Sequence, residues 1–599
     1  MNYRGLGDDE LYKTLVAICF VLSGVAALLA VRYPATGYEL SVYRSTPRSF
    51  WILLSLSVVL STYVSFSRVE SSKQNRLGLF ATTYSASLVV FLPLLRNYHF
   101  LGEGDMLTHL GWTRELLAGG RASTDLLYPA VHLLASMITR TSNLSVRTSL
   151  MLLSPIFVGL FVTFVSLFVR RIDHETGATT LGVFFALFLL PINHVTLHVE
   201  PSPRNLALFA VPFVLFAVYL VLIEQTIRTR LIALLAFFGL LVFHPMFAVV
   251  LTAFLSVVAV AIWVFQHLTS TDEYRAGTVF LQSLVLGVCT WAWIRFENVF
   301  TTFVSGLIFY ALEGAETAGD VSQRGASVAE VGGTLGSLFV KLFVVSLIVS
   351  IVVAAYTSDR AVALVRRGRS IETPHISREI LSLSFVFALV PIGAMMLLFL
   401  VTNRTTMFFR FAGFVMVIFT IVGAVATRRY AVTVVRLDSR LVLLPCIILL
   451  LGLSLLIVHP SGYIHQDTEH VTDADMTGYE SLFEYEQFDV RHDHVRSHAS
   501  RYGHAINGPA ERDRREYYHD GWRRGGAPDN FASQDLPTEY PSDTYLTISS
   551  ADERRESDLY SGFRFTDDDF EYLDRDTDIH RVHTTGEFRT YYVTTSRAD

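Results

Sequence analysis

The chain has 599 residues, of which 51% are hydrophobic, and its 54 acidic and 48 basic side chains give a formal charge of −6. This apolar content, gathered in long uncharged runs, excludes an ordinary soluble protein and favours one that crosses a membrane many times. No glycine-rich phosphate loop, nucleophile elbow or paired-cysteine metal motif occurs in the sequence, which disfavours a nucleotide-driven pump.

The charges divide the chain into two parts. Residues 459–599 hold 30 acidic and 15 basic side chains, a formal charge of −15, and because the whole chain carries −6 the first 458 residues carry +9. We therefore expect a transmembrane domain over 1–458 and an acidic, water-soluble domain over 459–599. Only three of the basic residues are lysines, a composition that suits a high-salt environment.

Thirteen apolar stretches are long enough, or nearly so, to cross a bilayer as helices. They lie at 11–31, 50–67, 77–95, 149–169, 177–193, 205–223, 229–243, 246–266, 278–295, 335–356, 380–401, 411–427 and 441–458. In the tail, a turn signal at 585–587 precedes the strand-like run 589–593. The predicted fold is therefore an all-α polytopic membrane domain followed by a small mixed α/β domain.

Arginine placement predicts the orientation of these helices. With the N-terminus inside, the inner loops hold the arginine-rich segments 68–76, 170–171, 228–230, 360–378 and 428–440. This is a strong positive-inside pattern. The extracytoplasmic face then receives the tail and the outer segments 96–148, 194–204, 296–334 and 402–410. The short turn at His244-Pro245 is critical, because merging the spans on either side of it would flip everything that follows.

The large outer loop, 96–148, carries an unusual group of polar residues. Gly102-Glu103-Gly104-Asp105 precedes a stretch with one apolar stripe that ends at Gly119-Gly120, which predicts an amphipathic helix at the membrane surface. Asp105 would open this helix, with His109 one turn on along the same face. A carboxylate there either caps the helix or takes a proton from a hydroxyl, so Asp105 is the candidate general base and Glu103 the second candidate.

More ionisable residues collect on the same predicted face. They are His132 in the large loop, the later residues His198, Glu200 and Arg204, and the pair Arg404 and Arg410 near the twelfth span. Charged groups at membrane depth are costly and usually face a cavity or a partner. Arginine forks match phosphate oxygens, so a base opposite arginines predicts displacement of a lipid phosphate from a sugar by an acceptor hydroxyl. The arginines could instead anchor helix ends by snorkelling.

Some of these residues could instead bind a divalent metal. His194 and His198 have a spacing that could bind a metal together with Glu200 or Asp105. Histidines at a membrane interface are more often packed or hydrogen-bonded than metal-bound, and no motif in the chain requires a cofactor.

These residues carry a resemblance to a known family. Glu103-Gly104-Asp105 with His109, the run 128–133, the turn 198–201 and the late arginines resemble the GT-C superfamily of polytopic glycosyltransferases. The resemblance covers the membrane domain. It implies a dolichyl- or polyprenyl-phosphate-linked sugar as donor, an extracytoplasmic site, and the first-loop acid as catalytic residue. With so few lysines, the chain is similar to haloarchaeal dolichyl-phosphate-mannose mannosyltransferases of surface-glycoprotein N-glycosylation, which implies mannose and a glycan or glycoprotein acceptor.

Two departures and two alternatives accompany this resemblance. The acid loop follows the third span, where the family usually has it after the first. The tail has a single tryptophan, Trp522, where oligosaccharyltransferases of the superfamily have a Trp-Trp-Asp motif, so transfer of a whole glycan to asparagine is not expected. A lipid-linked sugar flippase or a non-catalytic membrane scaffold would also have many spans, but the crowding of polar residues in outer loops favours surface chemistry. No nucleic-acid partner is expected.

Overall fold

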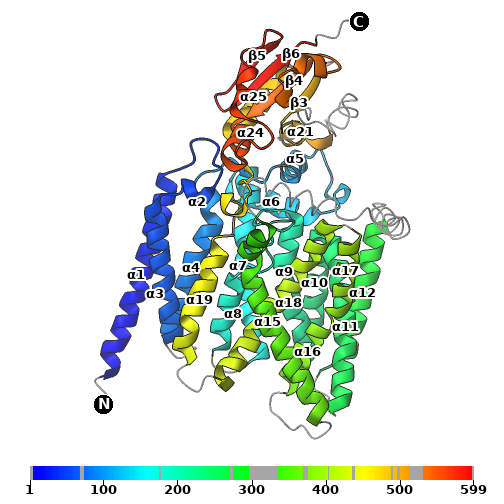
Figure 1. The fold of residues 1–599 in the computed structure, drawn as a ribbon. Helices are drawn as coiled ribbons and strands as arrows, with labels where there is room; N and C mark the ends of the chain where they lie inside the picture. The colour runs from blue at the N-terminus through cyan, green and yellow to red at the C-terminus, as the bar shows by residue number, and fades with distance from the viewer. Residues whose placement is uncertain are drawn as a thin grey trace.

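The computed structural model describes a bundle of long helices with a small sheet-containing domain stacked on one end of it (Figure 1). The described residues are 4–67, 73–174, 177–224, 226–269, 274–295, 334–367, 376–402, 404–434, 439–487, 490–495, 499–510 and 531–595. The predictions made for Trp522 and for nearly all of 296–334 lie outside them.

Within the described residues, ten helical segments are long and apolar enough to cross a membrane. They are formed by α1 (Arg4–Arg32), α3 (Arg48–Ser67), α4 (Lys73–Leu95), α7 (Val146–Ile172), α9 (Pro203–Glu224), α11 (Pro245–Thr269), α12 (Ala276–Arg295), α15 (Leu335–Arg367), the pair α16 (Ile376–Phe387) and α17 (Val390–Val401), and α18 (Thr405–Val434). A multi-pass, all-helical membrane domain is thus confirmed.

Ten of the thirteen predicted stretches thus form full-length candidate spans within the described residues. Three of the apolar stretches form shorter helices, namely α8 (Ala178–Leu187), α10 (Ile227–Phe243) and α19 (Ser439–Leu455), of 10, 17 and 17 residues. Helix α8 stops early because Leu189 adopts the left-handed conformation (φ 47°). The turn at His244-Pro245 does separate α10 from α11, as predicted.

The large loop and the soluble domain lie at the same end of the bundle, opposite the N-terminus (Figure 1). The loop folds into α5 (Asp105–Ala118), a short 3₁₀ turn and α6 (Pro129–Ser142). Strand β1 (Phe100–Leu101) pairs antiparallel with β2 (His470–Val471), which joins the loop to the segment leading into the soluble domain. The predicted placement of both on one face is confirmed, and that this face is extracytoplasmic stays a prediction.

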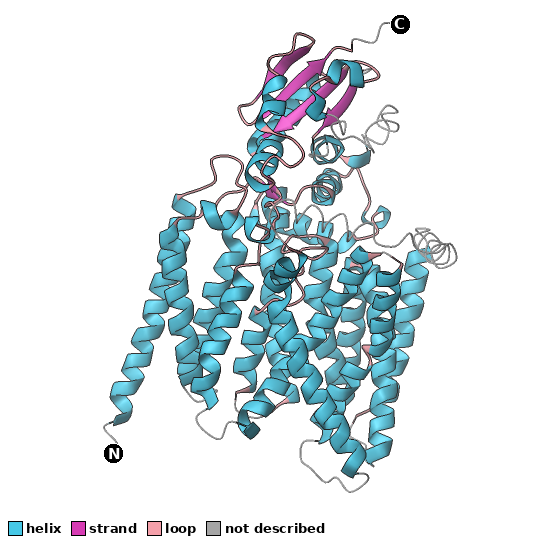
Figure 2. Ribbon diagram, viewed as in Figure 1, coloured by secondary structure: helices cyan, strands magenta, loops and turns pink. Residues whose placement is uncertain are grey.

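The C-terminal domain is built on a four-stranded sheet (Figure 2). Its strands, in the order β3-β4-β6-β5, are β3 (Arg491–His494), β4 (Thr544–Ser549), β6 (Phe588–Val593) and β5 (Ile579–Thr584). The main helices beside it are α20 (Asp473–Tyr485), α21 (Ala499–Asn507), α24 (Ser550–Arg554) and α25 (Asp567–Tyr572). Strand β4 is one of the two inner strands, and every residue of it is buried.

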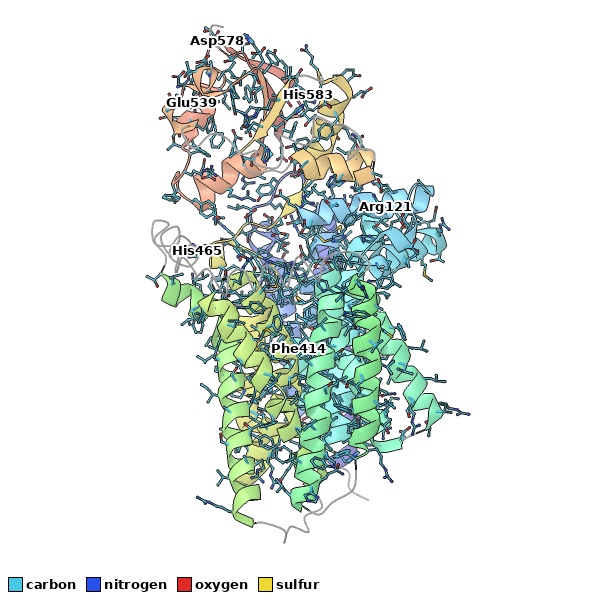
Figure 3. All side chains as sticks on the ribbon, turned by 90° about the vertical axis from the view of Figure 1, so that its right-hand side faces the viewer. Arg121, Phe414, His465, Glu539, Asp578 and His583 are labelled. Atoms are coloured by element: carbon cyan, nitrogen blue, oxygen red, sulfur yellow. The ribbon has the colours of Figure 1, made fainter. Side chains whose placement is uncertain are left out.

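The turn and strand predicted near the end of the chain are confirmed. Gly586 has φ 85°, a left-handed conformation that suits the turn between β5 and β6, and β6 covers the predicted run. In Figure 3, Phe414 lies within the helix bundle, His465 at the junction, and Asp578 and His583 on the sheet domain.

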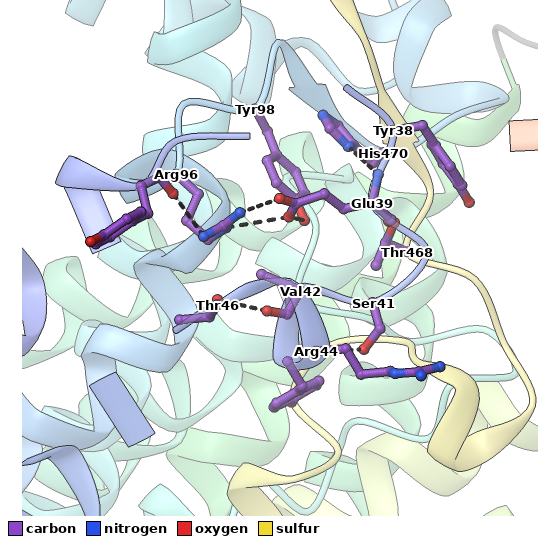
Figure 4. A network of polar contacts seen from close by, with 12 residues as sticks. Tyr38, Glu39, Ser41, Val42, Arg44, Thr46, Arg96, Tyr98, Thr468 and His470 are labelled. Atoms are coloured by element: carbon purple, nitrogen blue, oxygen red, sulfur yellow. Dashed lines mark hydrogen bonds and ion pairs between the residues drawn. The ribbon is translucent and has the colours of Figure 1, made fainter. Parts of the chain in front are cut away.

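A buried ion pair fastens the N-terminal region to the junction (Figure 4). The Arg96 guanidinium pairs with the Glu39 carboxylate, which also accepts a 2.6 Å hydrogen bond from the Tyr98 hydroxyl. The ring of His470 stacks on Tyr98 with ring centroids 3.7 Å apart, and the Thr468 hydroxyl donates to the Glu39 carbonyl. These contacts hold the β1–β2 pair in place beneath the soluble domain.

A second buried cluster joins three helices at the opposite end of the bundle. The fully buried Asp173 carboxylate, at the end of α7, lies 3.1 Å from the Arg378 guanidinium of α16 and 3.0 Å from that of Arg428 in α18. One buried carboxylate therefore contacts two buried guanidiniums from different helices. Removing its charge should destabilise the fold.

We expect Asp173→Asn to lower the free energy of unfolding by about 3–5 kcal/mol, because it removes the charge of a fully buried carboxylate that two buried guanidiniums contact. Thermal unfolding of the detergent-solubilised protein measures this loss. Asp359→Asn is the matched control, since the Asp359 carboxylate is 53% exposed and pairs at the surface with Arg360. Equal melting temperatures for the two variants would contradict the assignment.

Of the three cysteines, Cys19 is buried, whereas Cys289 is half-buried and Cys446 is exposed. All three are free thiols. An apolar run marks a helix that enters lipid, but it does not say whether a given residue faces the bundle or the lipid.

Candidate active site

Two glycines place the acidic loop. Gly102 (φ 104°) and Gly104 (φ 61°) both adopt left-handed backbone conformations, and the Gly102 amide donates to the Glu469 carbonyl at 3.0 Å. A Cβ at Gly102 would come within 2.7 Å of Met106. The chain can therefore turn sharply here and start α5 at Asp105.

Asp105 does not cap α5. The N-cap residue is Gly104, and no side chain caps this helix. The Asp105 carboxylate is 81% exposed and lies 2.6 Å from the guanidinium of Arg501, which comes from α21 of the soluble domain. Arg501 also donates to the Thr108 hydroxyl at 2.8 Å. The C-terminal domain thus contributes a cation directly to the predicted base.

The predicted helix at the membrane surface exists, but protein covers part of it. Helix α21 packs on α5 so closely that a Cβ at Gly111 would lie 2.0 Å from the His504 carbonyl oxygen. The Arg114 guanidinium donates to the Ala505 carbonyl at 2.6 Å. As predicted, the helix ends at Gly119, which has φ 78°. Asp105 therefore sits between the helix bundle and the soluble domain.

Two arginines of the membrane domain lie near each other, and one of them, Arg410, is within electrostatic range of this carboxylate. Arg204, in the first turn of α9, lies 3.6 Å from Glu200. Arg410, in α18, lies within electrostatic range of Arg204 and Asp105 and forms no ion pair with any carboxylate among the described residues. The Nε atoms of both guanidiniums are buried and have no hydrogen-bond partner in the described part of the chain. Together the two arginines present more positive charge than their neighbours neutralise.

His244 completes this group from the turn between α10 and α11. Its ring stacks on Tyr128 with the centroids 4.9 Å apart. Burial, together with the nearby guanidiniums of Arg410 and Arg204, lowers the pKa of His244 to about 3. The ring is therefore neutral and adds no positive charge to the site, although its Nδ1 atom is buried and lacks a partner within the described ranges.

Glu103 lies in a different environment from Asp105. Burial raises the pKa of Glu103 to about 8, although Arg555 opposes this shift. The Arg555 guanidinium is 3.9 Å from Glu103 but closer to Asp467, with which it forms the tighter ion pair. A carboxyl group with this pKa is mostly protonated at neutral pH, so Glu103 is a poor proton acceptor there.

His109 of α5 and His132 of α6 form a buried pair between these two helices. His109 Nδ1 lies 3.3 Å from His132 Nε2, and His132 Nδ1 is 3.0 Å from the Thr113 hydroxyl. The indole of Trp112 packs edge-on against both rings. Burial lowers the pKa of His109 to about 3. In this arrangement the neutral imidazoles support α5, and direct contact with a substrate stays a prediction.

The geometry does not support a metal site at His194 and His198 within the described residues. Within the described residues, no three His, Cys, Asp or Glu side chains are arranged to hold a metal ion. His194 and His198 do lie together, with ring centroids 5.4 Å apart, but His194 uses its Nε2 atom on the Ile457 carbonyl. Glu200 accepts a 3.3 Å hydrogen bond from Asn205.

Arg404 differs from Arg204 and Arg410 in its exposure to solvent. It is exposed, just before α18, and its amide donates to the Phe399 carbonyl at 2.7 Å. Arg410 therefore lies within electrostatic range of both Asp105 and Arg204, and Arg501, which the sequence analysis missed, pairs with Asp105. No sequence signal could have found Arg501, because it meets Asp105 only through the docking of two domains.

Known proteins resemble this chain only distantly. No protein-family model and no curated protein matches it. ArnT from Cupriavidus metallidurans, bound to undecaprenyl phosphate, is 12% identical with a TM-score of 0.44, over 92% of this chain and 100% of that chain. An Archaeoglobus fulgidus oligosaccharyltransferase tethered with an acceptor peptide is 13% identical with a TM-score of 0.43, over 86% and 74%. The archaeal oligosaccharyltransferase AglB from the same organism, in complex with an inhibitory peptide and a dolichol-phosphate, is 14% identical with a TM-score of 0.42. The match covers 88% of this chain and 75% of that chain. With TM-scores below 0.5, these likenesses assign no family.

Proposed function

We propose that this protein is a membrane glycosyltransferase that moves one sugar from a dolichyl- or polyprenyl-phosphate donor to a glycan acceptor. The observation that carries the proposal is Arg410, a half-buried guanidinium without a carboxylate partner among the described residues, within electrostatic range of Arg204 and of the exposed Asp105. Two neighbouring guanidiniums, one with a buried Nε atom that lacks a partner there, suit an anion such as a lipid phosphate.

The chemistry assigns a role to each group. The Asp105 carboxylate accepts the proton of an acceptor hydroxyl, whose oxygen then bonds to the anomeric carbon of the donor sugar. The bond between that carbon and the phosphate oxygen breaks, and the phosphate leaves with the electron pair. Arg204 and Arg410 stabilise the charge that develops on the phosphate. The products are the extended glycan and a free lipid phosphate.

Arg501 has a positioning role in this proposal. Its guanidinium binds Oδ1 of Asp105 and the Thr108 hydroxyl at once, which fixes the carboxylate at the start of α5. The second carboxylate oxygen, Oδ2, then takes the proton of the acceptor hydroxyl. Glu103 is proposed as a neighbour of the site and not as the base, because its carboxyl is mostly protonated at neutral pH.

The finer identity of the substrates rests on the sequence resemblance. Mannose carried on dolichyl phosphate is the donor that the resemblance implies, and a protein N-glycan that lacks its terminal sugar is the acceptor. The scarcity of lysine is in keeping with an archaeal surface in high salt. The proposal places the site and the C-terminal domain on the extracytoplasmic side of the cell membrane, as the arginine-rich inner loops favour.

Single cysteines at Ser123 and Ser533, in a variant without the three native cysteines, should both react with a membrane-impermeant thiol reagent in intact cells. Ser123 lies in the outer loop and Ser533 in the soluble domain, so both would face outward. Mass spectrometry of the isolated protein measures the labelling. Protection of both positions until the cells are lysed would place the site on the cytoplasmic side.

A flippase and a scaffold fit the site less well. A flippase needs polar groups through the depth of the membrane. Below Arg410, however, α18 buries Phe414, Val417 and Ile421 in the apolar core. A scaffold would not need a buried guanidinium without an anion. The test is reconstitution: the purified protein should release free lipid phosphate when it is supplied with both the lipid-phosphate sugar and the acceptor glycoprotein.

A further inference from the structure

The joint between α6 and α7 carries the motif Asn143-Leu144-Ser145. An asparagine followed two positions later by serine or threonine, with no proline between them, is the acceptor sequence for N-glycosylation of secreted proteins. Three residues of this kind also occur by chance, so their place in the fold decides whether they can be modified. The joint belongs to the large outer loop, which lies at the same end of the helix bundle as the soluble domain (Figure 1).

The whole joint is exposed to solvent. Residues 140–145 form an unbroken exposed run that includes the asparagine and the serine of the motif. Asn143 is the C-cap of α6 in a left-handed conformation (φ 59°), and its backbone amide donates to the Thr139 carbonyl at 3.1 Å. Its side-chain amide makes no hydrogen bond with any described residue. An enzyme can therefore reach this amide without unfolding either helix.

The joint also stands clear of the hydrocarbon core of the membrane. Helix α7 has 27 residues and is therefore about 40 Å long, whereas the hydrocarbon core is about 30 Å thick. Its first turn contains the polar residues Arg147 and Thr148. Ser145 is the N-cap of α7, and its hydroxyl accepts a 3.2 Å hydrogen bond from the Thr148 amide. The motif thus lies at the level of the lipid headgroups or above them.

Two other asparagines of the same face provide a comparison. Asn97 is exposed and left-handed (φ 56°) like Asn143, but His99 follows it two positions later and supplies no hydroxyl. The motif Asn403-Arg404-Thr405 has a hydroxyl, but its threonine is buried in the first turn of α18, and Asn403 lies outside the described residues. The comparison therefore favours Asn143.

We propose that Asn143 carries an N-linked glycan, which makes this protein a substrate of the glycosylation to which its proposed function belongs. The inference rests on the proposed function in one respect, because that function places the outer loop on the extracytoplasmic side. The donor is a lipid-linked oligosaccharide, and a separate oligosaccharyltransferase attaches it. The Nδ2 atom of Asn143 bonds to the anomeric carbon of the first sugar, and the amide proton passes to a base of that enzyme. The bond between this carbon and the lipid phosphate breaks, and the phosphate leaves with the electron pair.

Mass spectrometry of the full-length protein, purified from its own cells, tests the proposal. Cleavage by trypsin after Arg140 and Arg147 releases the peptide 141–147, in which Asn143 is the only asparagine. We expect this peptide to carry the mass of a glycan and to yield sugar fragment ions. The peptide 97–114, which contains Asn97, should have its unmodified mass. The surface glycoprotein of the same cells is the positive control for N-glycosylation.

Two variants assign the glycan to the motif. Asn143→Gly removes the side-chain amide, and glycine suits the left-handed C-cap of α6, so the fold should be kept while the glycan is lost completely. Ser145→Thr keeps both the motif and a hydroxyl that caps α7, so the glycan should remain. A glycan that persists in Asn143→Gly would lie on a neighbouring hydroxyl and would overturn the assignment.

The inference and the proposed function fail separately. An unmodified peptide 141–147 from wild-type cells whose surface glycoprotein is glycosylated would overturn the inference, and labelling from outside at position 123 would then show that the proposed topology still holds. In cells whose only copy is Asp105→Asn, the glycan on Asn143 should be present but shorter by one sugar. A complete glycan on Asn143 in those cells would contradict the proposed function and leave the modification site intact.

Discussion

Asp105→Asn should lower the rate of sugar transfer by about 10²–10⁴-fold while the protein inserts and folds normally. A hydroxyl is a weak nucleophile at neutral pH, and a positioned carboxylate that takes its proton in the transition state contributes a factor of this size. Asparagine has nearly the same shape but cannot accept that proton. Because the side chain is 81% exposed and caps no helix, its replacement removes no buried contact.

The measurement is the initial rate with purified variants in lipid vesicles. Asp105→Glu should retain partial activity, because the carboxylate is kept but displaced by one methylene. Asp125→Asn is the matched control, an exposed acid in the same outer loop, and should turn over as the wild type does. Normal activity of Asp105→Asn would reduce Asp105 to an ion-pair partner of Arg501.

Arg410→Ala should lower kcat/KM for the lipid-phosphate donor by about 10²–10³-fold, the usual cost of removing one preorganised group that stabilises developing charge. The loss should be smaller in Arg204→Ala, because the Arg204 charge is already partly balanced by Glu200 at 3.6 Å. The KM for the acceptor should change little in either variant, since the acceptor carries no phosphate.

Lysine substitutions separate charge from geometry at these positions. Arg410→Lys keeps the positive charge but loses the planar fork that binds two phosphate oxygens, so its activity should fall between those of wild type and alanine variant. Arg140→Ala, an exposed arginine on the same face of the molecule, serves as the matched control. If Arg204→Ala and Arg410→Ala both turn over normally, these arginines only anchor their helices.

The sequence predicted the architecture well where one physical rule decided it. The length of an apolar run decides whether a helix can cross a membrane, and each predicted span is helical, although α8, α10 and α19 are short. The rule fails for α8, because the chain leaves the helix at Leu189 inside an apolar stretch, and hydropathy does not register a left-handed residue. The run at 589–593 became β6 because it is rich in aromatic and β-branched residues, which favour strands, and follows a turn signal.

The site was predictable only in part. Asp105 and Arg410 could be singled out, because charge at membrane depth needs an explanation wherever it occurs. The ion pair of Asp105 with Arg501 joins residues 396 positions apart in the sequence (501 − 105), and no local pattern encodes it. The sequence also could not distinguish Glu103 from Asp105. That difference comes from burial beside Asp467 and Arg555, which only the folded chain creates.

The central claim is transfer of a sugar from a lipid phosphate, and one measurement tests it most directly. Purified protein in vesicles receives dolichyl-phosphate mannose with a radiolabelled sugar, together with the surface glycoprotein from a strain that lacks the gene. We predict that the label moves to the glycoprotein in step with the release of free dolichyl phosphate, and that neither occurs without the acceptor. Label that crosses the bilayer while still attached to its lipid, with none on the glycoprotein, would contradict the claim.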